Sequence, residues 1–357
     1  MKNDKLINFL LRHNERQSEE FATPDAVLER RQYRAKHPTE IAAWKCMDGR
    51  LHLPIITETP LGIIQPFRNI GGQFDLGWPF FGLLTKEWVD YALNRGRDSL
   101  IFVTYHFSKS NVHLGCKGFA YDTEAAKKFT RNLVHQVERV FGVRHSVVYP
   151  IQLGIETDED ALILHGVGDA VLDLGKIKEI DEEKLCIQLR KLFPDMKTQM
   201  VEDLLPLVMG NLRHIAKKRN EKKTKVAIDH EEQILGVGRG FDWLHLHNKA
   251  LLVGPFSYDL GDPISKAAGI LLDNINCKRI PKKDGVVLMA SAVYRDEVGI
   301  ERQLANEKAI SLAQFAMSTI KEKVPDLMHH LNLLVGTVDL NTRKFNRLPF
   351  KFQVKKK

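Results

Sequence analysis

The chain has 357 residues, of which 43% are hydrophobic and 27% are charged. This is the composition of a soluble globular protein that is long enough for two domains with separate cores. No apolar run reaches the ~18–20 residues that a membrane helix needs, and the N-terminal segment is too polar for a secretory signal. Four cysteines in this length do not form a disulfide framework. We therefore expect a cytoplasmic protein without membrane contact.

The net charge of +8 is concentrated in two places, residues 217–225 and the lysines at 355–357. Charge runs of this kind are usually solvated helix faces or loops, and the alternative is an electrostatic contact with an acidic partner or an anionic metabolite. A nucleic-acid-binding protein would interleave aromatic residues with its lysines and arginines. The basic runs contain almost no aromatic residue, so we expect no nucleic-acid partner.

The first half of the chain has the pattern of an α/β protein. Residues 1–40 are rich in Arg and Glu, with little apolar surface, and predict a short helical segment. A strand pattern follows over 42–53, and 99–105 is apolar enough for a strand buried on both faces of a parallel sheet. The pattern also predicts a helix over 123–141 and strands over 146–153 and 161–165. Ligands of such sheets usually lie beyond the carboxyl ends of the strands.

The polar segment 217–233 divides the chain, and a similar rhythm of strands and helices follows it. The pattern predicts strands over 243–254 and 285–293, and helices over 263–275 and 301–320. We therefore expect three parts: a short helical N-terminal segment over 1–40, a first α/β domain over 41–230, and a second α/β domain over 231–357.

The most informative motif is the C-x-D-x-R of Cys46, Asp48 and Arg50, which is followed by Cys116 among glycines and histidines. Two thiolates and one imidazole form a known catalytic zinc set that leaves one coordination position open. We therefore expect 41–230 to be a catalytic zinc-binding α/β domain. Asp48 is expected to project on the same side of a strand as Cys46 and to reach that open position. Arg50 can hold the carboxylate in a bidentate pair, so that Asp48 accepts a hydrogen bond there instead of binding the metal.

Two histidines compete as the third ligand. His106 directly follows the buried strand pattern at 99–105, which is where a side chain can reach over a sheet edge. His113 forms a compact H-x-x-C with Cys116. His106 is the preferred ligand on this ground, and His113 stays open as the alternative.

With these residues, the chain resembles the β-class carbonic anhydrases. These enzymes carry C-x-D-x-R, then an R-N-x-G-type segment, and then His and Cys after a second strand. The middle segment here is 68–72, in which Arg68, Asn69, Gly71 and Gly72 are expected to line or position the cleft. The chain is most similar to the diverged carboxysome-shell branch, over about residues 40–345, through the stretches 106–116, 154–161 and 236–241.

The resemblance implies a β-carbonic-anhydrase-like sheet flanked by helices, with a degenerate C-terminal copy that forms an internal pseudo-dimer. The second half agrees, because its Cys277-Lys278-Arg279 lacks the acid of the motif. It also implies zinc as the cofactor and reversible hydration of CO₂ to bicarbonate and a proton by zinc-bound hydroxide. We expect CO₂ and bicarbonate as the small-molecule partners, and a homo-oligomer that is at least a homodimer.

The alternative function is a catalytically inactive zinc-stabilised scaffold or carboxysome-shell-associated binding protein, in which Asp48 closes the metal site. The pairing of Asp48 with Arg50 favours the enzyme, because a purely structural site has no need of an arginine to hold a carboxylate off the metal. The carboxysomal branch has a long N-terminal extension, whereas about 40 residues precede the catalytic domain here. A free cytoplasmic enzyme is therefore expected, with the carboxysome as the alternative location.

Overall fold

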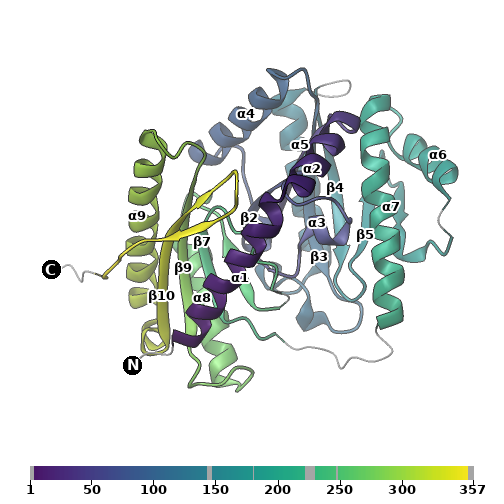
Figure 1. Cartoon of the computed structure of the whole chain (residues 1–357). Helices are drawn as coiled ribbons and strands as arrows, with labels where there is room; N and C mark the ends of the chain where they lie inside the picture. The colour runs from purple at the N-terminus through teal and green to yellow at the C-terminus, as the bar shows by residue number, and fades with distance from the viewer. Residues whose placement is uncertain (1–3, 143–146, 180, 222–229, 247, 353–357) are drawn as a thin grey trace. The chain divides into compact units, whose positions relative to one another are not determined.

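The computed structural model describes residues 4–142, 147–179, 181–221, 230–246 and 248–352 (Figure 1). The chain divides into two compact units, which are described separately below. Unit 1 contains residues 1–27, 47–50 and 228–357, and unit 2 contains residues 28–46 and 51–227. Within the described residues, no helix combines the length and apolarity that crossing a membrane requires. The predicted boundaries at residues 40 and 230 stay a prediction.

Unit 2 is built on a six-stranded sheet in the order β2-β1-β3-β4-β5-β6. The first four strands are parallel, and β5 and β6 are added antiparallel. The strands are β1 (Glu40–Cys46), β2 (Ile64–Asn69), β3 (Ser99–Phe107), β4 (Val148–Glu156), β5 (Ala161–His165) and β6 (Val171–Asp173). Every residue of β3 from Ser99 to His106 is buried, as expected for a central parallel strand with both faces covered.

Helices flank this sheet. Helix α5 (Thr123–Phe141) has the bounds that the sequence predicted, because Asp122 accepts a hydrogen bond from the Ala125 N–H (2.9 Å) and so caps its first turn. Its buried face packs on β3 and β4. The other helices of the unit are α3 (Leu53–Ile56), α4 (Pro79–Leu93), α6 (Glu182–Leu192) and α7 (Thr198–Glu221), with the short 3₁₀ turns η1 (Ile70–Gly72), η2 (Val112–Leu114), η3 (Lys117–Phe119) and η4 (Leu174–Lys176).

Unit 1 is built on a five-stranded sheet in the order β11-β10-β9-β7-β8. Its strands are β7 (Ile234–Gly238), β8 (Ala250–Val253), β9 (Val286–Tyr294), β10 (Leu331–Asp339) and β11 (Phe345–Arg347). One core cluster joins Ile7 and Leu10 of α1 (Asp4–Ala22) to this sheet, and another joins the sheet to the alanines of α9 (Ile300–Lys323). The remaining helical elements are α2 (Pro24–Lys36), which straddles the division between the units, α8 (Gly261–Asn276) and η6 (Pro325–His329).

The two sheets repeat one topology. In unit 2 the order β2-β1-β3-β4-β5 has three parallel pairings and a final antiparallel one, and β8-β7-β9-β10-β11 has the same order and the same directions. Helices α4 and α5 precede and follow β3 as α8 and α9 precede and follow β9. The α/β class with two parallel-dominated sheets flanked by helices, predicted from the sequence, is therefore confirmed.

Two predicted strands differ from the structure, and the start of a third falls outside the described residues. The strand expected over 42–53 ends at Cys46, because the chain turns over residues 47–50. The strand expected over 243–254 is confined to β8. Trp243 lies in a turn, and its side chain is buried in the core cluster that also contains Ile7 and Leu10 of α1. Ser146, the expected start of a strand, lies outside the described residues, and that strand begins at Val148. Both overestimates are of apolar segments that are buried without being extended.

Candidate metal centre

Two of the predicted ligands lie at the carboxyl ends of neighbouring parallel strands. Cys46 is the last residue of β1, and His106 is the penultimate residue of β3. The two strands pair directly, with Trp44 opposite Val103. The side chains are almost completely inaccessible, with 6% exposure for Cys46 and 3% for His106. The sheet register therefore brings a thiol and an imidazole to one buried edge.

The third predicted ligand, Cys116, lies between η2 and η3, where the chain folds tightly. Its carbonyl accepts hydrogen bonds from the N–H groups of Phe119 and Tyr121 (3.1 and 2.9 Å). Gln73, which follows η1, donates from Nε2 to the Gly118 carbonyl (2.9 Å) and so joins the two loops. A side chain at position 118 would lie 2.7 Å from the Gly71 nitrogen, so glycine is needed for this close approach.

The three side chains form a candidate metal site. Cys46, His106 and Cys116 are all buried, and their Sγ and ring nitrogen atoms lie within 4.8 Å of one another. Neither ring nitrogen of His106 has a hydrogen-bond partner among the described residues, although both are buried. An unpartnered buried imidazole costs free energy, and a metal ion bound to one of its nitrogens would remove part of that cost. Two sulfurs and one imidazole are a donor set that suits zinc.

The segment at 68–72 lies beside these ligands. Gly72 has a φ of 64°, and a side chain there would lie 3.0 Å from the Thr104 carbonyl oxygen and 3.4 Å from the Cys46 nitrogen. Gly71 also has a positive φ, of 60°. Asn69 donates from Nδ2 to the Gln73 carbonyl (2.6 Å), and its Oδ1 is buried without a hydrogen-bond partner. Arg68 is buried at the end of β2. The glycines thus allow the chain to pass directly against the ends of β1 and β3.

The structure brings His106, and not His113, to the two cysteines. His113 is exposed in η2, where its ring makes an edge contact with Tyr121 (5.2 Å between ring centroids). The cluster of potential metal ligands found among the described residues contains His106 and not His113, although His113 lies only three residues before Cys116.

These positions predict opposite results for the two histidines. His106→Ala should lower the affinity for zinc by more than about a hundredfold. Loss of a residue that only hydrogen-bonds to a metal ligand typically costs up to about a hundredfold, and loss of the ligand itself should cost more. His113→Ala should leave the affinity unchanged, since the side chain is exposed. Competition with a chromophoric zinc chelator measures both constants. Equal losses in the two variants would contradict the assignment.

Asp48 and Arg50, in unit 1, form the predicted pair. Arg50 Nη2 lies 2.6 Å from Asp48 Oδ2, and Nε lies 3.0 and 3.1 Å from the two carboxylate oxygens. The Arg50 backbone N–H also donates to Oδ1 (2.9 Å), and both side chains are less than 10% exposed. The segment is bound to β8 by Gly49 N–H to the Ala250 carbonyl (2.9 Å) and by Leu252 N–H to the Met47 carbonyl (2.7 Å). The bidentate pair therefore rests on a turn held along a strand.

His230 is a residue that the sequence did not single out. In unit 1 its Nδ1 lies 2.7 Å from Glu232 Oε1, and it interacts electrostatically with Arg50 and Asp48. Burial lowers the pKa of His230, but the hydrogen bond and charge of Glu232 raise it, and the resulting pKa lies above the ordinary histidine value. No sequence signal could identify this residue, because it lies within the long polar segment 217–233, which has no recognisable periodicity.

Because the two sheets repeat one topology, the residues of unit 1 that are equivalent to the metal ligands of unit 2 can be identified. Ile41 pairs with Leu100, and in the same register Ile234 pairs with Val287. Counting along these strands, Arg239 takes the place of Cys46, and Val293 takes the place of His106. The counterpart of the motif is therefore the glycine-rich end of β7, and not the Cys277 segment that the sequence suggested. Unit 1 has neither sulfur nor imidazole at these two positions.

No protein-family model matches the sequence. The chain is similar to two curated proteins that are both named carboxysome shell carbonic anhydrase. The one from Hydrogenovibrio crunogenus (strain DSM 25203 / XCL-2) is 25% identical over 283 residues, which cover 65% of this chain and 52% of the relative. The one from Prochlorococcus marinus subsp. pastoris (strain CCMP1986 / NIES-2087 / MED4) is 26% identical over 233 residues, which cover 57% of this chain and 46% of the relative.

The fold and the cluster define an α/β protein with two repeated sheet units and a buried candidate Cys₂His metal centre. With the two similarities, the chain is a distant relative of the carboxysome shell carbonic anhydrases, as its motifs predicted. The chain spans about half the length of the curated relatives it matches.

Proposed function

We propose that this protein is a zinc-dependent carbonic anhydrase that interconverts CO₂ and bicarbonate. The observation that carries the proposal is the buried triad Cys46, His106 and Cys116, whose imidazole has no other partner for its ring nitrogens among the described residues. The names of the two distant relatives support the same activity. Carbonic anhydrase chemistry needs a metal with one open position, and three protein ligands leave one.

Zinc bound by the triad would supply a water activated at neutral pH for attack on CO₂. Thiolates and a neutral imidazole are the forms that bind zinc, so zinc binding would release protons from the cysteines. The burial of all three side chains excludes bulk water and keeps the local dielectric constant low. We assign Arg68, Asn69, Gly71 and Gly72 to shaping this pocket, with the unpartnered Asn69 Oδ1 as its polar atom.

Asp48 is the proposed catalytic side chain beyond the ligands, and Arg50 positions it. Asp48 follows Cys46 by two residues, and two residues of extended chain span at most about 7 Å. This covalent limit is compatible with a role of the carboxylate beside a metal bound to Cys46. Because Arg50 already donates three side-chain contacts to this carboxylate, Asp48 is held as an acceptor for a proton donor and is restrained from binding zinc itself.

We further propose that the two units of one chain form an internal pseudo-dimer and that two chains form a homodimer. The proposed location is the cytoplasm. The names of the relatives link the lineage to the carboxysome, and residence in its shell is the alternative location. The competing function is a zinc-stabilised scaffold without activity, in which Asp48 closes the coordination sphere.

Metal removal tests the proposal directly. We expect the purified chain to contain zinc, to accelerate CO₂ hydration in a stopped-flow pH-indicator assay, and to lose this activity on dialysis against a strong chelator. Added zinc should restore the activity, and added magnesium, which prefers oxygen ligands, should not. A zinc-loaded, folded chain that hydrates CO₂ no faster than buffer would contradict the enzyme and favour the scaffold.

A further inference from the structure

Unit 1 has a hollow of about 610 Å³ that the proposed reaction does not use. Its lining residues come from β10, from the last residue of β11 and from the chain that follows β11. This part of the chain is the yellow end of the ribbon in Figure 1. Its lining is mostly apolar and includes two cations: Leu333, Val335, Arg347, Leu348, Pro349, Phe350 and Lys351.

The hollow has a fixed apolar floor. Leu348 N–H donates to the Val335 carbonyl (2.8 Å) and continues the pairing of β11 with β10 by one residue. Pro349 has no N–H, so the pairing ends there and the chain leaves the sheet. Leu333, Leu348 and Phe350 pack against the core cluster under α9. The side chains around the hollow are therefore held by the sheet and its core.

The two cations that line the hollow, Arg347 and Lys351, form no ion pair with a side chain of the described residues. Residues 340–352 contain four cations and no acid. One of them, Arg343, pairs with Asp242 (3.3 Å). The other three are exposed, and none forms an ion pair with a side chain of the described residues: Lys344, Arg347 and Lys351. An apolar surface with an unpaired cationic rim is complementary to a ligand that combines apolar groups with negative charge.

The surroundings exclude several occupants. Asn14 Oδ1 accepts the Phe345 N–H (2.7 Å), so α1 covers part of the outer edge of β11, and a partner cannot add there as a strand. No phenylalanine of this segment is fully exposed for base stacking, which disfavours a nucleic acid. Arg347, Pro349 and Lys351 are exposed, so the hollow opens to solvent, whereas small-molecule sites bury most of their ligand.

We propose that this hollow binds an acidic segment of another protein, with an apolar side chain between Leu333, Val335 and Phe350 and carboxylates on Arg347 and Lys351. Arginine suits this role because its guanidinium can bind a carboxylate in a bidentate manner. The binding is independent of the metal centre, so CO₂ hydration should be the same with and without the peptide.

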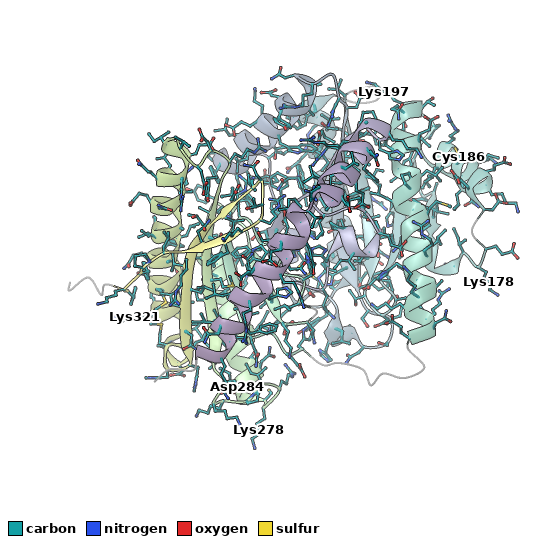
Figure 2. All side chains as sticks on the ribbon, in the orientation of Figure 1. Lys178, Cys186, Lys197, Lys278, Asp284 and Lys321 are labelled. Carbon is teal, nitrogen blue, oxygen red and sulfur yellow. The ribbon has the colours of Figure 1, made fainter. Side chains whose placement is uncertain are left out.

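The probe is a short fluorescent peptide with leucine and phenylalanine between glutamates, and the readout is fluorescence anisotropy with the full chain. Arg347→Glu/Lys351→Glu should weaken binding at least about tenfold, since like charges now face the peptide. The matched control is Lys282→Glu/Lys321→Glu, which makes the same charge change at exposed positions of unit 1; Lys321 lies on α9 (Figure 2). The control should bind as the wild type does, apart from a small loss from long-range charge.

A second peptide, with serines in place of leucine and phenylalanine, separates the apolar hollow from charge alone. It should bind at least about tenfold more weakly, because burying one large apolar side chain contributes about 1.5–3 kcal/mol. Equal binding of the two peptides, or equal losses in the two double variants, would overturn the proposal. So would displacement of the first peptide by duplex DNA or by phosphatidylserine vesicles at lower concentrations than the unlabelled peptide requires.

Discussion

Cys46→Ser and Cys116→Ser are each expected to lose zinc and CO₂ hydration together. Zinc bound at structural sites contributes about 10–16 kcal/mol, so removing one of three protein ligands should take away roughly 3–5 kcal/mol. This corresponds to a loss of roughly 10²–10⁴ in zinc affinity. Serine is nearly the same size as cysteine, and its hydroxyl remains protonated and binds zinc poorly. The measurements are metal content after gel filtration and stopped-flow CO₂ hydration on the same samples.

Cys186→Ser is the matched control, because it makes the same chemical change in the same unit. Cys186, labelled in Figure 2, is partly exposed on α6, which packs on α7 and β6 and not on the strands β1 and β3 that carry Cys46 and His106. This variant should keep both zinc and activity. A Cys46→Ser protein that retained zinc and hydrated CO₂ at the wild-type rate would remove the basis of the proposed function. Circular dichroism of each variant separates loss of metal from loss of fold.

The elements that the sequence predicted best are those whose stability depends on local pattern. Helix α5 has a cap at Asp122 and an apolar face repeated every three to four residues, so its bounds follow from the sequence alone. Strand β3 is a continuous apolar run, as central parallel strands are. The triad was also predictable in part, because ligand type and spacing identify a metal motif, and strand ends identify where the motif should lie.

The sequence failed where tertiary contacts decide the structure. Trp243 belongs to an apolar run that suggests a strand, yet the run forms a turn that packs on α1. Asp48 was expected on a strand with Cys46, but that strand ends at Cys46 and the next residues follow β8 instead. The unit 1 residue equivalent to Cys46 could not be identified from the sequence either, because the equivalence of Arg239 follows only from the register of β7 with β9. Pairings between distant segments leave no periodic signal in one sequence.

Arg50→Ala is expected to keep zinc and to lower kcat/KM for CO₂ hydration at least about a hundredfold. Removing one preorganised hydrogen-bond donor from an active site typically has an effect of this size. Without the Arg50 side chain, the Asp48 carboxylate loses the three contacts that the guanidinium makes with it. A carboxylate two residues from Cys46 can then occupy the open coordination position. In the cobalt-substituted protein, this closure should appear as a changed visible absorption spectrum, because the added oxygen ligand alters the coordination.

The double variant Asp48→Asn/Arg50→Ala separates this closure from simple damage. If the freed carboxylate blocks the metal, then Asp48→Asn/Arg50→Ala should be no less active than Asp48→Asn alone, because asparagine is a much weaker ligand. Since the pair is buried, removing Arg50 alone takes away the guanidinium that faces the buried Asp48 carboxylate. This should destabilise the fold by up to about 3–5 kcal/mol, which the double variant partly restores. Thermal unfolding measures this difference. Arg50→Ala protein that is folded, zinc-loaded and fully active would show that the arginine has no part in keeping the coordination position open.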